Sequence, residues 1–156
     1  MFRSFPRLSA ALVVSCFLAL PAQAAGPPAG PLGVWSTEGD KSRVRIEPCG
    51  EAQSGALCGQ LVWLKEPVNA EGQAKVDRNN PEEALRARPI VGLPLLAGFK
   101  PEAGRPGHWA GGTIYDPESG KTYNGTITLQ PDGGLSVRGF VGMPMFGRTV
   151  VWTRIP

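Results

Sequence analysis

The polar side chains best suited to binding chemistry cluster in one stretch of this 156-residue chain, where Asp77, Asn80 and Arg88 follow one another closely. Two interpretations of this stretch are open. In the first, Asp77 and Asn80 cap backbone amides, and Asp77 pairs with Arg78 or Arg88 to hold a long loop in place. In the second, Arg88 and its polar neighbours line the mouth of a barrel, where the planar guanidinium binds an anionic head group.

Three residues further along the chain are also candidates for ligand binding, because they lie in runs of alternating residues that are typical of β-strands. Whether each of them faces the interior depends on the pairing register, since a slip of one residue reverses every assignment. The full set of candidate ligand-binding residues is Asp77, Asn80, Arg88, Tyr115, Tyr123 and Arg138.

Catalytic and metal chemistry find little support in the residue pattern. His108 is the single histidine, so a metal site or a Ser-His-Asp triad would have to use it, yet no further ligand follows at a suitable spacing. No glycine-rich phosphate loop precedes a helix. We therefore expect no catalytic residue, no metal and no cofactor, and we treat a hydrolase as the least supported alternative.

Apolar residues in loop-like contexts form a second candidate surface, which consists of Phe99, Met143, Met145 and Phe146. Methionine and phenylalanine in such positions suit a pliable rim around a hydrophobic ligand or partner. They suit equally well a plug that closes one end of the core. Both interpretations remain open at the level of the sequence.

Short runs of β-type residues separated by turn signals indicate the elements that must position these side chains. The expected strands are residues 34–37, 42–47, 57–64, 109–115, 122–129, 134–141 and 148–155. One short helix is expected at residues 80–86, where Asn80 precedes Pro81 and two acids, inside an otherwise irregular stretch at residues 66–107. Because closure removes exposed sheet edges, this pattern favours an all-β fold, a small antiparallel barrel with one long loop that carries a short helix.

The first 24 residues have the pattern of a cleavable export signal. Arg3 and Arg7 open the segment and an apolar run follows at residues 8–20. A small-x-small pattern ends at Ala24, and signal peptidase would cut after this residue. The alternative is lipidation of Cys16, although the apolar run continues past this residue.

Beyond the signal, residues 25–32 are expected to form a flexible leader and residues 33–156 to form one domain, located in the periplasm or secreted. Two of the 16 Lys and Arg residues lie in the signal, which leaves 14 against 13 Asp and Glu and a net charge of about +1. This balance gives no support for nucleic-acid binding. No later segment is long and apolar enough to cross a membrane as a helix.

Cys49 and Cys58, with eight residues between them, are the two cysteines that follow the signal. An even pair in an exported protein predicts a disulfide, which would pin a hairpin. A redox or metal pair is the alternative, but the spacing is wide and other thiol or imidazole ligands are lacking.

Several motifs taken together resemble a bacterial exported family, the domain of unknown function 2147. The motifs are residues 77–81 (DRNNP), 88–93 (RPIVGL), 111–117 (GGTIYDP) and 120–123 (GKTY), together with Gly33-x-Trp35, the cysteine pair, Arg138-Gly139, Gly142 and Trp152-Thr153-Arg154. The resemblance covers nearly the whole chain after the signal. It implies a calycin-like barrel of the lipocalin or fatty-acid-binding-protein type, and it brings no established activity.

The resemblance also implies a structural role for residues at the two ends of the domain. In lipocalin-like barrels an arginine of the last strand packs over the tryptophan of a first Gly-x-Trp strand, and Arg154 and Trp35 resemble that pair. A guanidinium over an indole face contributes about 0.5–2 kcal/mol. We therefore expect Trp35, Arg154 and the neighbouring Trp152 to stabilise the barrel.

These observations favour a non-enzymatic binding protein of the cell envelope. Its ligand would be small, partly apolar or with an anionic head group, and held in the barrel or at its mouth. The alternative is a solidly packed barrel that acts as a protein-interaction or envelope-structure module. Its surface for an envelope protein partner would be the stretch at residues 66–107 or the turn at residues 143–146.

Overall fold

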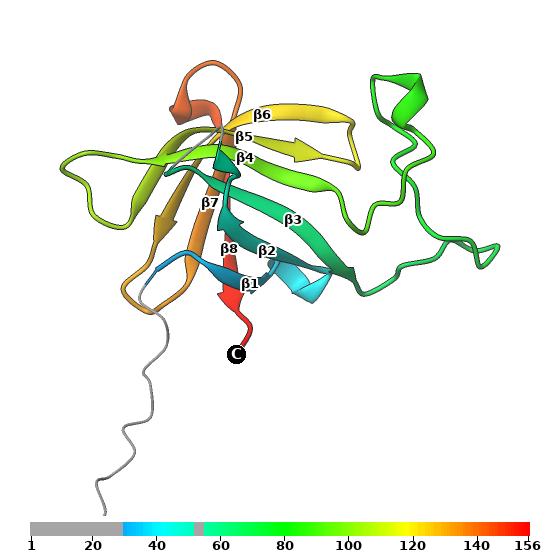
Figure 1. Ribbon diagram of the computed structural model, residues 1–156, viewed down its shortest axis with the longest axis horizontal. Coiled ribbons are helices and arrows are strands. Elements are labelled where there is room, and N and C mark those ends of the chain that lie inside the picture. The colour runs from blue at the N-terminus through cyan, green and yellow to red at the C-terminus, as the bar shows by residue number, and fades with distance from the viewer. Residues whose placement is uncertain (1–29, 52–54) are drawn as a thin grey trace, which may run out of the picture.

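Eight antiparallel strands close into one barrel in the computed structural model, which describes residues 30–51 and 55–156 (Figure 1). Each strand pairs with the next one along the chain, and the last pairs with the first, which leaves no free sheet edge. The strands are β1 (Gly33–Ser36), β2 (Ser42–Pro48), β3 (Leu57–Leu64), β4 (Pro94–Pro101), β5 (His108–Asp116), β6 (Lys121–Leu129), β7 (Leu135–Phe140) and β8 (Arg148–Arg154). The prediction of a small all-β antiparallel barrel is confirmed.

Alternation of apolar and polar residues sets the two faces of most strands. In β2, Val44 and Ile46 are buried while Arg45 between them is exposed. In β6, Ile127 is fully buried, and the hydroxyl residues on either side of it, Thr126 and Thr128, lie on the outer face. A local period of two is therefore enough to explain which side chains enter the barrel.

Strand β4 corrects the expectation that residues 66–107 form one long irregular stretch. It pairs with β3 and with β5, and it carries two core side chains, Leu96 and Phe99. Proline at both ends of β4 and Gly98 in its middle (φ +73°) interrupt the local strand pattern. This segment therefore forms a strand because it pairs with β3 and with β5. Phe99 is therefore a core residue with no exposed surface, so for this residue the core interpretation holds and the rim interpretation does not.

The short helix expected within residues 80–86 is present as the 3-10 helix η3 (Glu83–Leu85), which covers fewer residues than the sequence pattern suggested. Its hydrogen bonds span three residues, from Leu85 N to Glu82 O and from Arg86 N to Glu83 O. None of its residues is buried, so the turn lacks the packing that would stabilise a longer helix. Two further 3-10 turns are η1 (Glu38–Asp40) and η4 (Pro144–Phe146).

The centre of the barrel is filled by the chain's own side chains. The buried core consists of Trp35, Val44, Ile46, Leu57, Leu96, Phe99, Ile127, Leu135, Val137 and Trp152. Three inward glycines make room for two of these residues. A Cβ at Gly112 would lie 2.4 Å from the Phe99 ring, one at Gly125 would lie 2.8 Å from it, and one at Gly59 would lie 2.8 Å from Leu96. Such close packing leaves these positions no space for a larger side chain or a ligand atom.

One end of the barrel is sealed around Trp35. The guanidinium carbon of Arg154 lies 4.2 Å from the centroid of the Trp35 ring, and Trp35 Nε1 donates to Pro31 O at 2.8 Å. Arg154 also donates to the carbonyl oxygens of Leu32 and Gly30. Trp152 is buried beside them in the core. These contacts tie the last strand to the segment that leads into the first.

A disulfide joins Cys49 and Cys58, with 5.0 Å between their Cα atoms, and the prediction from the cysteine pair is confirmed. It links the residue after β2 to the second residue of β3, in the same hairpin. Residues 52–54 between them lie outside the described part of the chain.

The expected signal peptide at residues 1–24, the alternative lipidation site at Cys16 and most of the leader at residues 25–32 lie outside the described residues. In the part that the structure does describe, no helix has the length and apolar character needed to cross a bilayer.

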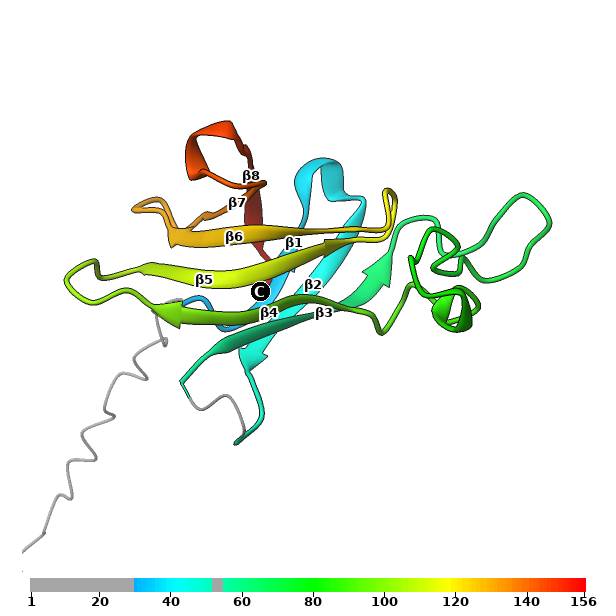
Figure 2. The ribbon, with the colours of Figure 1, turned by 90° about the horizontal axis from the view of Figure 1, so that it is seen from above.

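The connection between β3 and β4, residues 65–93, extends from the barrel beside the β5–β6 turn (Figures 1 and 2). Two isolated bridges, Val68 with Ala74 and Val76 with Pro89, fold this loop back on itself. The second bridge encloses residues 77–88, which include the candidate residues Asp77, Asn80 and Arg88.

Candidate functional site

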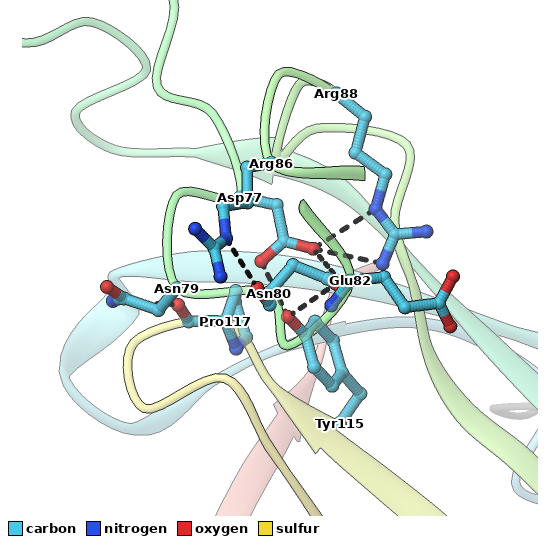
Figure 3. A network of polar contacts seen from close by, with 8 residues as sticks. All are labelled: Asp77, Asn79, Asn80, Glu82, Arg86, Arg88, Tyr115 and Pro117. Atoms are coloured by element: carbon cyan, nitrogen blue, oxygen red, sulfur yellow. Dashed lines mark hydrogen bonds and ion pairs between the residues drawn. The ribbon is translucent and has the colours of Figure 1, made fainter. Parts of the chain in front are cut away.

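Four of the six candidate residues meet in one hydrogen-bonded network, which we call the loop clamp: Asp77, Asn80, Arg88 and Tyr115 (Figure 3). Tyr115 Oη donates to Asp77 Oδ1 at 2.6 Å. The other carboxylate oxygen, Oδ2, accepts from Asn80 Nδ2 at 2.8 Å and from Arg88 Nε and Nη2 at 3.1 and 2.9 Å. Both carboxylate oxygens of Asp77 are thus used within the clamp.

The loop clamp fastens the β3–β4 loop to the β5–β6 hairpin. Tyr115 comes from β5, where the neighbouring Ile114 packs against the core, so Tyr115 points to the outer face. Asn79 reinforces the contact, because its Nδ2 donates to Glu118 O in the hairpin turn at 2.7 Å. Gly120 lets the loop approach this closely, since a Cβ there would lie 1.8 Å from Asn79 O and the residue has φ +68°.

Electrostatics keeps Asp77 ionised although the residue has no exposed surface. Burial by itself raises the pKa of this carboxyl, but the hydrogen bonds from Tyr115, Asn80 and Arg88 and the charge of Arg88 outweigh it and hold the pKa below its usual value. Burial and then the hydrogen bond to Asp77 raise the pKa of Tyr115, so its hydroxyl stays protonated and donates.

Arg88 is committed to the clamp through two of its three nitrogens. Its side chain is 32% exposed, and its guanidinium carbon lies 5.9 Å from the centroid of the Tyr115 ring. Because a buried carboxylate neutralises its charge, Arg88 is poorly placed to attract an anion as well. The clamp therefore fits the interpretation in which Asp77 and Arg88 hold a long loop.

A second region lies on the outer face of β5, β6 and β7, where an open groove has a volume of about 570 Å³. We call it the outer groove. Cross-strand pairs build its floor, since Thr126 lies opposite Arg138, Thr128 opposite Ser136, and Arg138 opposite Thr149 of β8. These are outward positions, so hydroxyl groups and one guanidinium face the groove.

Arg138 holds its place in the outer groove through neutral partners. Its Nε donates to Pro144 O at 2.8 Å and its Nη1 donates to Thr149 Oγ1 at 2.7 Å. The ion pairs found among residues 30–51 and 55–156 all involve other cations. Within that part of the chain, the positive charge of Arg138 is not neutralised by a carboxylate.

The opposite end of the groove is closed by His108, which has 9% of its surface exposed. Its Nδ1 lies 2.8 Å from Thr128 Oγ1 and its Nε2 lies 3.1 Å from Glu102 Oε2, and Glu102 also binds Arg105 at 2.8 Å. Burial and then the charge of Arg105 lower the pKa of His108, against the opposing charge of Glu102. In the neutral ring Nε2 donates to the carboxylate and Nδ1 accepts from the threonine hydroxyl.

Apolar side chains stand beside the groove on the β7–β8 connection. Val141, Met143, Met145 and Phe146 are 63–76% exposed, and we call residues 141–146 the apolar tip. Pro144 in this segment and Phe140 before it also line the groove. The groove therefore has an apolar border next to Arg138.

The two remaining candidates from the sequence do not join the clamp. Tyr123 is half-buried and pairs with Ile114 on the inward side of β6, and Arg138 lies in the outer groove. The hydroxyl residues around Arg138 were not among the candidate residues predicted from the sequence. Their outward positions in the alternation of β6 were the available signal, but the same pattern is typical of a solvated strand face.

No group of three or more His, Cys, Asp and Glu side chains is arranged to bind a metal ion within residues 30–51 and 55–156. The loop clamp and the outer groove are the regions in which five of the six candidate residues lie: Asp77, Asn80, Arg88 and Tyr115 in the clamp, and Arg138 in the groove.

An eight-stranded antiparallel barrel in sequential order, sealed by a tryptophan–arginine pair, defines a lipocalin-like barrel. The chain belongs to the bacterial family described as "Uncharacterized protein conserved in bacteria (DUF2147)", whose model matches residues 33–154. The fold is similar to that of protein HP1028 from the human pathogen Helicobacter pylori, described as belonging to the lipocalin family, with 22% sequence identity and a TM-score of 0.67. The match covers 80% of this chain and 82% of that chain. A search among curated proteins gave no match.

Proposed function

We propose that this protein binds a small amphiphilic ligand with an anionic head group, without catalysis, and that it does so in the outer groove. The observation that carries the proposal is Arg138, a cation without a carboxylate partner in the described chain, set among hydroxyl groups in a groove of about 570 Å³. This volume lies within the range of about 300–1,000 Å³ that is usual for small-ligand sites.

The interior of the barrel is the less suitable place for a ligand. Phe99 and Leu96 occupy its centre against glycines that leave no further room. The loop clamp is also less suitable, because the charge of Arg88 is already paired with the buried Asp77. The outer groove combines an available positive charge with unoccupied volume.

The head group would bind at Arg138. A guanidinium presents donors in a planar fork that suits carboxylates and phosphates. Hydroxyl groups of Thr126 and Thr149, which lie opposite Arg138 on the neighbouring strands, would supply further hydrogen bonds. The apolar part of the ligand would lie against Phe140 and Pro144 at the border of the groove.

The N-terminal sequence supports a location outside the cytoplasm for the proposed function. We propose that residues 1–24 are a signal peptide cut after Ala24, that residues 25–32 are a leader, and that the domain at residues 33–156 acts in the periplasm or outside the cell. The disulfide between Cys49 and Cys58 supports this proposal, because such bonds persist in oxidising compartments.

The test is a titration of the purified protein with dodecanoate and with dodecyl phosphate, followed by calorimetry and native mass spectrometry. We expect a one-to-one complex with the wild type and at least tenfold weaker binding by Arg138→Gln. Arg45→Gln is the matched control, since Arg45 is an exposed cation on β2, and it should bind like the wild type.

Equal binding by wild type and Arg138→Gln would remove the proposed site. If neither amphiphile binds at all, the alternative gains support, namely a packed barrel that acts as a protein-interaction or envelope-structure module. The filled interior is compatible with that alternative, which assigns no role to the charge of Arg138.

A further inference from the structure

The apolar tip is the largest concentration of exposed apolar side chains in the described chain. Four of its six residues, Val141, Met143, Met145 and Phe146, are 63–76% exposed. The other large exposed apolar residues are scattered singly and are 42–53% exposed: Leu32, Val68, Val91 and Val151. Scattered apolar residues are normal on a protein surface, whereas a cluster of this kind marks an interaction site.

The tip is a formed structure that projects from the barrel (Figures 1 and 2). Its turn η4 is closed by hydrogen bonds from Phe146 N to Met143 O and from Gly147 N to Pro144 O. Arg138 of β7 donates to Pro144 O and so holds the turn against the barrel. At Gly147 the chain passes so close to β7 that a Cβ would lie 2.5 Å from Gly139 O.

Charge at the base of the tip favours an anionic surface. The tip itself carries no charged residue, and Arg148 is the first residue of β8, the strand that follows it. The side chain of Arg148 is 81% exposed and pairs with Glu38, which is itself 63% exposed. Such an exposed pair is weak, so Arg148 can exchange this partner for another anion.

The size of the tip argues for a membrane surface over a protein partner. A stable protein interface uses about 20–30 residues on each side, far more than this projection offers. Insertion into the boundary between head groups and acyl chains needs only a few apolar side chains, assisted by neighbouring cations that reach lipid phosphates. We propose that the apolar tip inserts into the surface of a lipid bilayer that contains anionic lipids.

The apolar side chains proposed to insert are separate from the outer groove, although Pro144 belongs both to the tip and to the groove lining. The side chains of Met143, Met145 and Phe146 lie outside the lining of the groove, which takes Phe140 and Pro144 from this part of the chain. Membrane contact is therefore a separate inference from ligand binding. The two proposals can fail independently.

The experiment is flotation of the purified protein with vesicles of phosphatidylglycerol and phosphatidylethanolamine, compared with vesicles of phosphatidylcholine alone. We expect the wild type to float with the anionic vesicles, more weakly at high salt, and at least tenfold less with neutral vesicles. The triple variant Met143→Ser, Met145→Ser and Phe146→Ser should lose at least tenfold of the bound fraction. Arg148→Gln should reduce it a few-fold through the loss of one phosphate contact.

Val68→Ser with Val91→Ser is the matched control, because both residues are exposed valines in the β3–β4 loop, and it should float like the wild type. The melting temperature of each variant shows that it is folded. Retained flotation of the triple variant overturns the proposal, and so does a wild type that ignores anionic vesicles. A wild type that dimerises or captures an envelope protein through the tip but does not float also overturns it. Binding of dodecyl phosphate by the triple variant tests the groove separately.

Discussion

Arg88 and Arg138 show how the same side chain is used in opposite ways in two regions of one barrel. Arg88 binds Asp77, a carboxylate with no exposed surface, and its charge is neutralised there. Arg138 binds a carbonyl oxygen and a hydroxyl group, and its charge is not neutralised within the described chain. The first arrangement stabilises a loop, whereas the second leaves a positive charge available to a ligand.

The largest effect on stability is expected when the charge of Asp77 in the loop clamp is removed. Asp77→Asn leaves Arg88 without its partner and places an amide where three donors converge, so we expect the free energy of unfolding to fall by about 3 kcal/mol. Urea denaturation measures the change. Glu71→Gln is the control, since Glu71 is exposed in the same loop, and it should change stability by less than about 0.5 kcal/mol. A loss below about 1 kcal/mol for Asp77→Asn would show that the clamp is not a main support of the loop.

The close approach of loop and hairpin is tested by two glycines with similar backbone angles. Gly120 has φ +68° and Gly133 has φ +86°. A Cβ at Gly120 would clash with Asn79 O, whereas a Cβ at Gly133 would have no neighbouring atom within 4 Å. Gly133→Ala should cost about 1 kcal/mol through backbone strain alone. Gly120→Ala should cost about 2 kcal/mol, because the loop must also move away. Equal melting temperatures would contradict the docking of residues 77–80 on the turn.

Acid pH should weaken the loop clamp. The folded state lowers the pKa of Asp77 below 3.8, so its contribution to stability is complete above that value and is lost as the pH falls through the folded pKa. The difference in stability between wild type and Asp77→Asn should therefore shrink as the pH is lowered below about 4. Urea denaturation at pH 7, 4 and 3 measures this difference in the free energy of unfolding. A difference that stays constant over this range would show that the ionised carboxylate of Asp77 does not stabilise the clamp.

The smallest effect is expected for the stability of the groove variant. Arg138→Gln breaks contacts at the surface and should lower the free energy of unfolding by less than about 1 kcal/mol. Arg88→Gln leaves the buried Asp77 without its cation and should lower it by about 3 kcal/mol. Thermal melts of the two variants compare the regions directly. Losses of the same size would mean that Arg138 is a structural residue like Arg88.

Most of the barrel was predictable because strand alternation is a local property. The alternation in β2 and β6 identified inward residues such as Ile46 and Ile127 before any pairing was known. Strand β4 was not predictable in this way, because Pro94, Gly98 and Pro101 interrupt its local pattern and only its two neighbours complete it. The helix within residues 80–86 is shorter than its sequence suggested for a related reason, since a favourable start does not extend a helix that buries nothing.

The contacts of the candidate residues also differ in how far the sequence could predict them. Asp77, Asn80 and Arg88 are close in sequence, so their meeting could be foreseen. Tyr115 joins them from 38 residues beyond Asp77, and this contact depends on how the β3–β4 loop folds back against β5. The neighbours of Arg138 come from two other strands, so the groove exists only once β6, β7 and β8 are paired.

The order of residues along this chain was thus sufficient to establish its family, its strand periodicity, its disulfide and the identity of its polar residues. The folded barrel alone decided which arginine is neutralised and which keeps its charge. The physical reason is distance, because ion pairs and hydrogen bonds act over a few ångströms. Closure of the barrel brings together residues that lie far apart in the sequence, such as Tyr115 with Asp77 and Thr149 with Arg138. These partners make the loop clamp a neutralised network and leave Arg138 in the outer groove with its charge.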